Sequence, residues 1–137
     1  MFDHELAMNA QNQVSRLVNT IVERTEGVRS IDDFLCSHPG GMLLDAVCMN
    51  LIAFGEATKN LDKITAGQLL SCYPQIRWED VMRMWDKIAH HDFEVDAEAV
   101  LLTVKEDIPQ VKEVVEKMIV EMNNKKANRY DIRRISS

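Results

Sequence analysis

Apolar residues recur at helical spacing along most of the chain, and this periodicity constrains the fold more than any other feature of the sequence. The clearest case is segment 78–89, where the apolar residues are Trp78, Val81, Met82, Trp85 and Ile88. The same spacing predicts long helices over residues 3–26, 41–60 and 97–122. No alternating strand pattern bounded by turns occurs in the sequence. The sequence therefore predicts an all-α domain, a bundle of about four long helices.

Capping and breaking residues set the expected ends of the helices. Ser30 can cap a short helix over residues 30–35, and Asp96 can cap the helix that follows it. The motif Thr65-Ala-Gly-Gln68 has the pattern of a capping box, which predicts a short connecting helix beginning there. The motif His38-Pro39-Gly40-Gly41 predicts a break before the helix at 41–60. The restart at Asp107-Ile108-Pro109 divides the last long helix.

The segment 41–60 is apolar on nearly all sides, which predicts a helix buried on more than one face. Such a helix is either central in the bundle or shares its outer face with a second copy of the chain. Asn50 and Glu56 interrupt it, so each is expected to bond a neighbouring helix or to line a polar site. The most apolar run, residues 42–54, contains Asp45 and Asn50 and is too short to span a membrane.

Length and composition predict one cytoplasmic domain. A chain of 137 residues suits a single core, and its opening MFDHELAM has neither the basic nor the apolar region of a signal peptide. The three cysteines, Cys36, Cys48 and Cys72, are expected to be reduced structural thiols. Cys36 and His38 lie close in sequence, but no second pair follows, so a buried thiol beside a loop histidine is favoured over a metal site.

Charge divides the chain into an acidic body and a basic tail. The formal charge is −6, and residues 123–137 carry five basic residues against one aspartate, a net +4, so residues 1–122 carry −6 − 4 = −10. We expect residues 1–122 to form the helical domain and 123–137 to form a tail. The tail could attract RNA or dock on an acidic partner, although a solvated, frayed end is the simpler interpretation.

Two adjacent histidines follow the helix at 78–89, and any chemistry is expected there. Imidazole exchanges protons near neutral pH, so His90 and His91 are candidates for acid–base catalysis. Alternatively, the pair can bond the last free carbonyls of the helix and interact with its dipole. A metal site formed by His90, His91 and Asp92 is disfavoured because adjacent histidines point in different directions.

Several motifs resemble the HepT-like (DUF86) group of HEPN-domain proteins, small all-helical bacterial ribonuclease toxins encoded beside a minimal nucleotidyltransferase antitoxin. In order, they are Asn50-Leu51, Gly55-Glu56-Ala57, Tyr73-Pro74 with Ile76 and Trp78, Ala89-His90-His91 with Phe93, Val95 and Asp96, and Asp107-Ile108-Pro109. Together they cover about residues 5 to 122. The resemblance implies an antiparallel bundle of about four long helices with short connecting helices, and a homodimer with active sites near the two-fold interface.

The departures from this family fall on its catalytic motif. That motif is an arginine, four residues, a histidine, one residue and a tyrosine. The histidine is kept as His90, whereas the arginine position holds Trp85 and the tyrosine position holds Asp92. Arg83 and Lys87 are candidate replacement cations for binding phosphate. Arg83 lies about 200° around the helix from position 85 and therefore points roughly the opposite way.

Two functions follow from the resemblance. The first is a toxin-type, metal-independent endoribonuclease in which His90 is the general acid/base and needs no cofactor. The second is a catalytically degenerate binding protein that docks a nucleotidyltransferase or RNA without turnover. The catalytic candidate is His90, and the candidate supporting residues are His91, Asp92, Trp85, Asp86 and Glu56. The expected partners are a second copy, a minimal nucleotidyltransferase and RNA, with no membrane association.

Overall fold

The computed structural model describes residues 2–89 and 96–135, without the side chains of residues 84, 87, 89 and 126–135. The four long helices are α1 (His4–Thr25), α3 (His38–Ile64), α4 (Trp78–Ala89) and α6 (Ile108–Ile135). Shorter elements connect them: α2 (Asp32–Leu35), the 3-10 helix η1 (Leu70–Cys72), α5 (Ala97–Leu102) and the π-helix η2 (Thr103–Asp107). The described residues contain no strand, and the predicted all-α bundle is confirmed.

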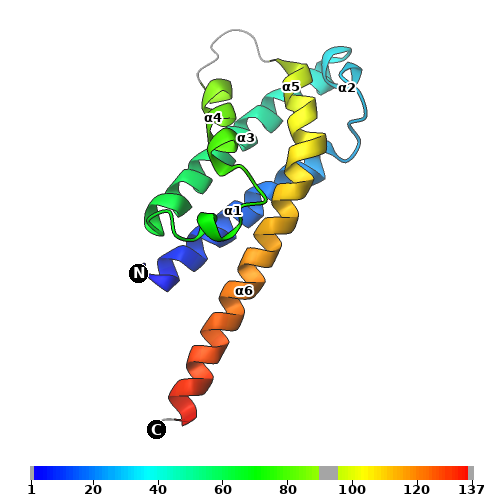
Figure 1. Ribbon diagram of the computed structural model, residues 1–137. Helices are drawn as coiled ribbons and strands as arrows, with labels where there is room; N and C mark the ends of the chain where they lie inside the picture. Colours follow the sequence, from blue (N-terminus) through cyan, green and yellow to red (C-terminus); the bar gives the residue numbers. More distant parts are fainter. Residues whose placement is uncertain (1, 90–95, 136–137) are drawn as a thin grey trace.

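The long helices alternate in direction, so the bundle is antiparallel (Figure 1). Helix α1 packs against α3 and α6, and α4 packs against α3. One hydrogen bond marks the pairing of α1 with α3: the Arg24 guanidinium donates to the Asn50 side-chain oxygen at 2.6 Å. Asn50 therefore bonds a neighbouring helix, one of the two roles expected for it.

Helix α3 is the central helix of the core. Its buried residues include Leu51, Phe54 and Leu61, which belong to the same hydrophobic core as Val14, Val18 and Ile21 of α1. By length and composition alone α3 could cross a membrane. Since its contacts with α1 and α4 bury part of this helix, with 44% of its apolar window inside the fold, we interpret it as a core helix.

Helix α3 begins three residues earlier than expected. The predicted break at residues 38–41 is its first turn, with the Ser37 hydroxyl accepting from the Gly40 amide at 3.0 Å. Pro39 is tolerated because the first amides of a helix have no partner within it. A serine cap followed by a proline is therefore a start signal here, and the prediction of a break was wrong.

The other end of α3 also differs from the prediction. Thr65 is the C-cap of α3 and opens no helix. The Ala66 amide donates to the Lys63 carbonyl, and the Gly67 amide donates to the Asp62 carbonyl. This pair of bonds is a Schellman motif, and it places Ala66 at φ 52° and Gly67 at φ 74°. The capping-box prediction was therefore wrong, because the same residues end the preceding helix.

The segment that leads into α4 is held by side-chain hydrogen bonds. The Trp78 indole donates to the Tyr73 carbonyl at 3.0 Å, and the Tyr73 hydroxyl donates to Glu121 of α6 at 2.6 Å. Burial, followed by the bond to Glu121, raises the pKa of Tyr73. These contacts fix the position at which α4 begins, and therefore also the position of its last residue, Ala89.

Helix α6 continues to Ile135, 13 residues beyond Met122. Among the α6 residues whose side chains are described, the last buried one is Met122, which is 4% exposed, and residues 123–125 are exposed. The basic segment, however, continues the helix without a break where a frayed tail is the simpler expectation. Figure 1 shows this part of α6 extending beyond the other helices.

Candidate functional site

The predicted site lies at the end of α4. His90, His91 and Asp92 follow α4 directly and lie outside the described residues. Four other candidates have described side chains: Trp85, Asp86 and Arg83 on α4, and Glu56 on α3. Their placement shows which groups the described parts of α3 and α4 contribute near the end of α4.

Trp85 belongs to the hydrophobic core. It is 2% exposed, and its ring meets Phe54 edge-on with the ring centroids 4.4 Å apart. It also lies directly over Gly55, where an added Cβ would come within 2.7 Å of the indole ring. Gly55 therefore provides the space that lets α4 approach α3 closely.

The indole N–H of Trp85 has no hydrogen-bond partner among the described groups, although it is fully buried. An unsatisfied buried donor costs about 1–3 kcal/mol. Apolar packing against Phe54 and α3 therefore has to offset this cost. Trp85 stands at the position where the HEPN motif has an arginine. Its side chain packs in the hydrophobic core and carries no charge.

A charged cluster joins α3 to α4 next to Trp85. The Lys59 ammonium donates to the Asp86 carboxylate, and it lies 3.7 Å from Glu56. The side chains are partly exposed, at 35% for Lys59, 44% for Asp86 and 66% for Glu56. The bond to Asp86 is the main cause that raises the pKa of Lys59. One ammonium facing two carboxylates leaves this cluster with a net charge of −1.

Lys59 has no role in the sequence-based prediction of the site. Its spacing from Glu56 suggests an ion pair within one helix. Its bond to Asp86 depends on how α3 and α4 pack together, and only the structure gives that register. The ion pair with Asp86 joins α3 to α4 four residues before His90 in the sequence.

Arg83 lies away from Trp85, as its position on the helix predicts. Its side chain is 69% exposed, and its guanidinium is 4.0 Å from Asp80 on the same helix. Lys87 belongs to α4, but its side chain is outside the described atoms. The described part of α4 thus presents one guanidinium, and that group is loosely paired on an exposed face.

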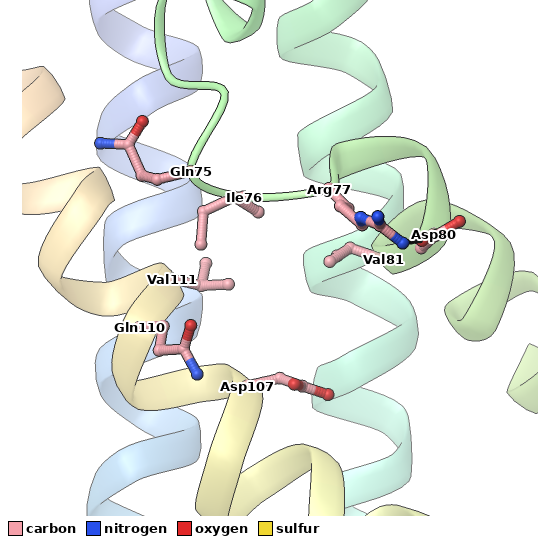
Figure 2. A pocket seen from close by; sticks show the side chains of 8 residues that line it. All are labelled: Gln75, Ile76, Arg77, Asp80, Val81, Asp107, Gln110 and Val111. Atoms are coloured by element: carbon pink, nitrogen blue, oxygen red, sulfur yellow. Dashed lines mark ion pairs between the residues drawn. The ribbon is translucent and has the colours of Figure 1, made fainter.

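A separate pocket of about 460 Å³ opens beside the first turn of α4 (Figure 2). It lies between the loop before α4 and the start of α6, and its charged lining residues are Arg77, Asp80 and Asp107. Arg77 is 3.7 Å from Asp80, while burial, and then Glu106, raises the pKa of Asp107. Two carboxylates against one guanidinium disfavour a phosphate there. The pocket also lies at the first turn of α4, whereas His90 follows the last residue of α4 in the sequence.

Within the described residues, no group of three histidine, cysteine or carboxylate side chains could hold a metal ion. Cys36 is exposed, and the neighbouring Asp32 raises the pKa of its thiol. The thiol of Cys36 was expected to be buried, and that expectation was wrong because α2 is a single turn at the surface.

Comparison with known proteins identifies the family. A family model described as "Ribonuclease HepT-like" matches residues 14–118, which include all of α3 and α4. "Probable ribonuclease HepT" of Thermococcus cleftensis is 34% identical over 105 residues, covering 77% of this chain and 88% of the relative. "Gamma-glutamylcyclotransferase and putative RNase MJ0434" of Methanocaldococcus jannaschii is 31% identical over 121 residues, covering 88% of this chain and 51% of the relative. No solved structure gives a significant match. The chain therefore belongs to the HepT-like ribonuclease family.

Proposed function

We propose that this protein is the toxin component of a toxin–antitoxin pair and cleaves RNA without a metal ion. The observation that carries the proposal is the family match, which spans α4 and the His90 segment that follows it. In the proposed reaction the RNA 2′-oxygen bonds to the adjacent phosphorus while the bond from phosphorus to the 5′-oxygen breaks. His90 moves the proton that leaves the 2′-hydroxyl, and the 5′-oxygen takes up a proton.

The residues at the other motif positions, together with the placement of the nearby cations on α3 and α4, predict a slow enzyme. Removing one fixed donor from a developing negative charge typically costs about 10²–10³ in rate, and Trp85 supplies no donor to a phosphate. Lys59 is engaged by two carboxylates, and Arg83 is exposed on another part of α4. Asp92 would also repel a phosphate beside it. We therefore expect turnover well below that of a protein with the complete motif.

A second candidate function is binding without turnover, and the buried Trp85 favours it. The scaffold is intact while the guanidinium position is part of the core. In this role the protein docks a minimal nucleotidyltransferase or RNA. The resemblance to the HEPN group implies that the motif tyrosine is the place where the nucleotidyltransferase attaches adenylate. Asp92 holds that position and has no phenolic hydroxyl. Tyrosine adenylylation at this position is therefore excluded, and a nucleotidyltransferase would inhibit the protein by binding alone.

The proposed active unit is a cytoplasmic homodimer. Met42 and Met49 are 61% and 67% exposed and lie seven residues apart on α3, so they share one side of that helix. A second copy packed on this side would cover the apolar surface that a single bundle leaves open. The resemblance to the HEPN group supports this assembly, in which the two sites share one cleft.

One assay separates the two functions. The purified wild-type protein, His90→Ala and His38→Ala are incubated with transfer RNA and with bulk RNA in EDTA. His38 is exposed on the first turn of α3 and serves as the matched control. Cleavage by the wild type and by His38→Ala, but not by His90→Ala, supports the nuclease. Intact RNA with all three proteins overturns it and leaves the binding function.

The partner is tested separately. If a minimal nucleotidyltransferase is encoded beside this gene, the two purified proteins should co-elute in size-exclusion chromatography. We expect no transfer of adenylate to residue 92 when ATP is added, as measured by peptide mass. Separate elution at micromolar concentrations would contradict the proposed pairing.

A further inference from the structure

The C-terminal part of α6 forms a helical arm, residues 123–135. Met122 is the last buried residue among the described side chains of α6, and the next three residues are exposed, while the helix continues to Ile135. At 1.5 Å per residue the arm is about 20 Å long. Figure 1 shows that it extends past the bundle with no other helix beside it.

The arm continues the buried stripe of α6 in register but changes its chemistry. Within the bundle this stripe is apolar and includes Val111, Val115, Met118 and Met122. At about 100° per residue, positions within roughly 60° of the same line beyond Met122 are 125, 126, 129 and 133. The sequence at those four positions is Lys125, Lys126, Arg129 and Arg133. The stripe therefore turns from apolar to basic where the helix leaves the core.

The same register argues against an apolar partner for the arm. Its apolar residues are Ala127, Tyr130, Ile132 and Ile135, and they fall on several sides of the helix without forming a stripe. Packing of the arm against another apolar helix is consequently disfavoured. Four basic positions in line match the repeated negative charge of a polynucleotide backbone.

The distribution of charge along the chain suggests a role for the arm. Residues 1–122 carry a net −10, which repels RNA at long range, whereas residues 123–137 carry +4. We propose that the arm binds the phosphate backbone of single-stranded RNA and holds it to an otherwise acidic protein. This inference rests on the proposed function, in which RNA is the substrate.

The test measures binding in a protein that leaves the RNA intact. Full-length His90→Ala protein is titrated into a fluorescein-labelled, unstructured RNA of about 20 nucleotides, and anisotropy is recorded at several salt concentrations. The arm variant adds Lys125→Gln, Arg129→Gln and Arg133→Gln. The matched control instead adds Lys63→Gln, Lys112→Gln and Lys117→Gln, which removes the same charge from described positions on the body.

We expect the arm variant to bind more weakly by roughly tenfold to a hundredfold near 0.1 M salt. Its slope of log affinity against log salt should fall by about 2, since each lost contact with single-stranded RNA removes about 0.7. The control should keep most of the affinity and the slope. Equal losses in both variants would overturn the inference, because net charge alone would then explain binding.

Two further outcomes separate this inference from the proposed function. Arm-dependent binding together with intact RNA in the wild-type assay would support the arm and overturn the nuclease. If the wild-type protein cleaves RNA while the arm variant binds RNA with an unchanged salt slope, the inference about the arm is overturned and the nuclease function is kept. If the arm variant changes the mass of the assembly in sedimentation while RNA affinity is unchanged, the arm contacts a second copy and the inference is wrong.

Discussion

Among single residues, Trp85 and Gly55 form a close contact across the α3–α4 interface. The indole ring occupies the space that any side chain at position 55 would need. The sequence places Trp85 on the apolar stripe of α4 and, by resemblance, at the arginine position of the HEPN motif. The first interpretation is confirmed by its burial, since a large aromatic ring at this point of the stripe is drawn into the core.

A double-mutant cycle tests this contact. Trp85→Ala should cost about 3–5 kcal/mol of unfolding free energy, because it leaves a cavity. Gly55→Ala should cost about 1–3 kcal/mol in the wild type by overpacking. In the Trp85→Ala background the same change should become neutral or stabilise by up to about 1 kcal/mol, through helix propensity. Urea unfolding followed by circular dichroism measures all four proteins.

Gly41→Ala is the matched control, because an added Cβ there meets nothing within 4 Å. It should stabilise the protein slightly with either residue at position 85. Additive effects of Gly55→Ala and Trp85→Ala would mean that the ring does not press on α3.

Cys48 provides a second test at the same scale. Burial, followed by Asp45, raises the pKa of its thiol from 9.0 to about 11. The unfolded chain ionises first as pH rises, so the stabilising effect is present below pH 9 and is lost between pH 9 and 11. Wild-type unfolding free energy should fall by about 1–2 kcal/mol more than that of Cys48→Ala over this range, allowing for partial solvation. Urea titrations at pH 8.5 and 10.5 give the difference, and parallel curves would contradict it.

At the scale of helices, the sequence predicted the elements better than their boundaries. The stripes of α1 and α4 follow directly from apolar spacing, and Asp96 caps α5 as expected, accepting from the Ala99 amide at 3.1 Å. Both ends of α3 were misassigned because each signal has two meanings. A proline can break a helix or begin one, and Thr-x-x-Gln can start a helix or follow the end of another.

The ion pairs between helices could not be predicted from the sequence. Lys59 reaches Asp86 across the interface between α3 and α4. This contact depends on the close packing and the register of the two helices, which the absence of a side chain at Gly55 permits. Spacing within one helix identifies neighbours three or four residues apart, but it carries no information about the helix across the interface. Hydrophobic periodicity therefore cannot identify residues that act through contacts between helices.

The end of α3 supports a direct prediction. Ala66 has φ 52°, a left-handed conformation that glycine adopts more easily than alanine. Ala66→Gly should raise the unfolding free energy by about 0.5–1 kcal/mol. The same change inside α3, Ala46→Gly, should lower it by about 1 kcal/mol. Urea unfolding compares the two, and a loss of stability in Ala66→Gly would show that the Schellman conformation is not maintained in solution.

At the scale of the whole molecule, an apolar side and a basic arm remain outside the core of one bundle. We expect the double variant Met42→Lys, Met49→Lys to shift a wild-type dimer toward monomer by at least tenfold in dissociation constant. Lys substitution removes apolar contact area and introduces charge repulsion across a two-fold axis. Sedimentation equilibrium measures the change.

Leu6→Lys with Val120→Lys is the control, since both residues are exposed apolar positions on other helices. It should leave the association unchanged. A monomeric wild type at micromolar concentrations, or equal weakening by both pairs, would contradict a dimer built on the Met42 and Met49 side of α3.

The most direct test of the account is the chemistry of the RNA ends left by the purified protein in EDTA. We predict 2′,3′-cyclic phosphate and 5′-hydroxyl ends, formed slowly by the wild type and by His38→Ala, and absent with His90→Ala. RNA that stays intact with the wild type, or products with 5′-phosphate ends, would contradict metal-independent cleavage through His90.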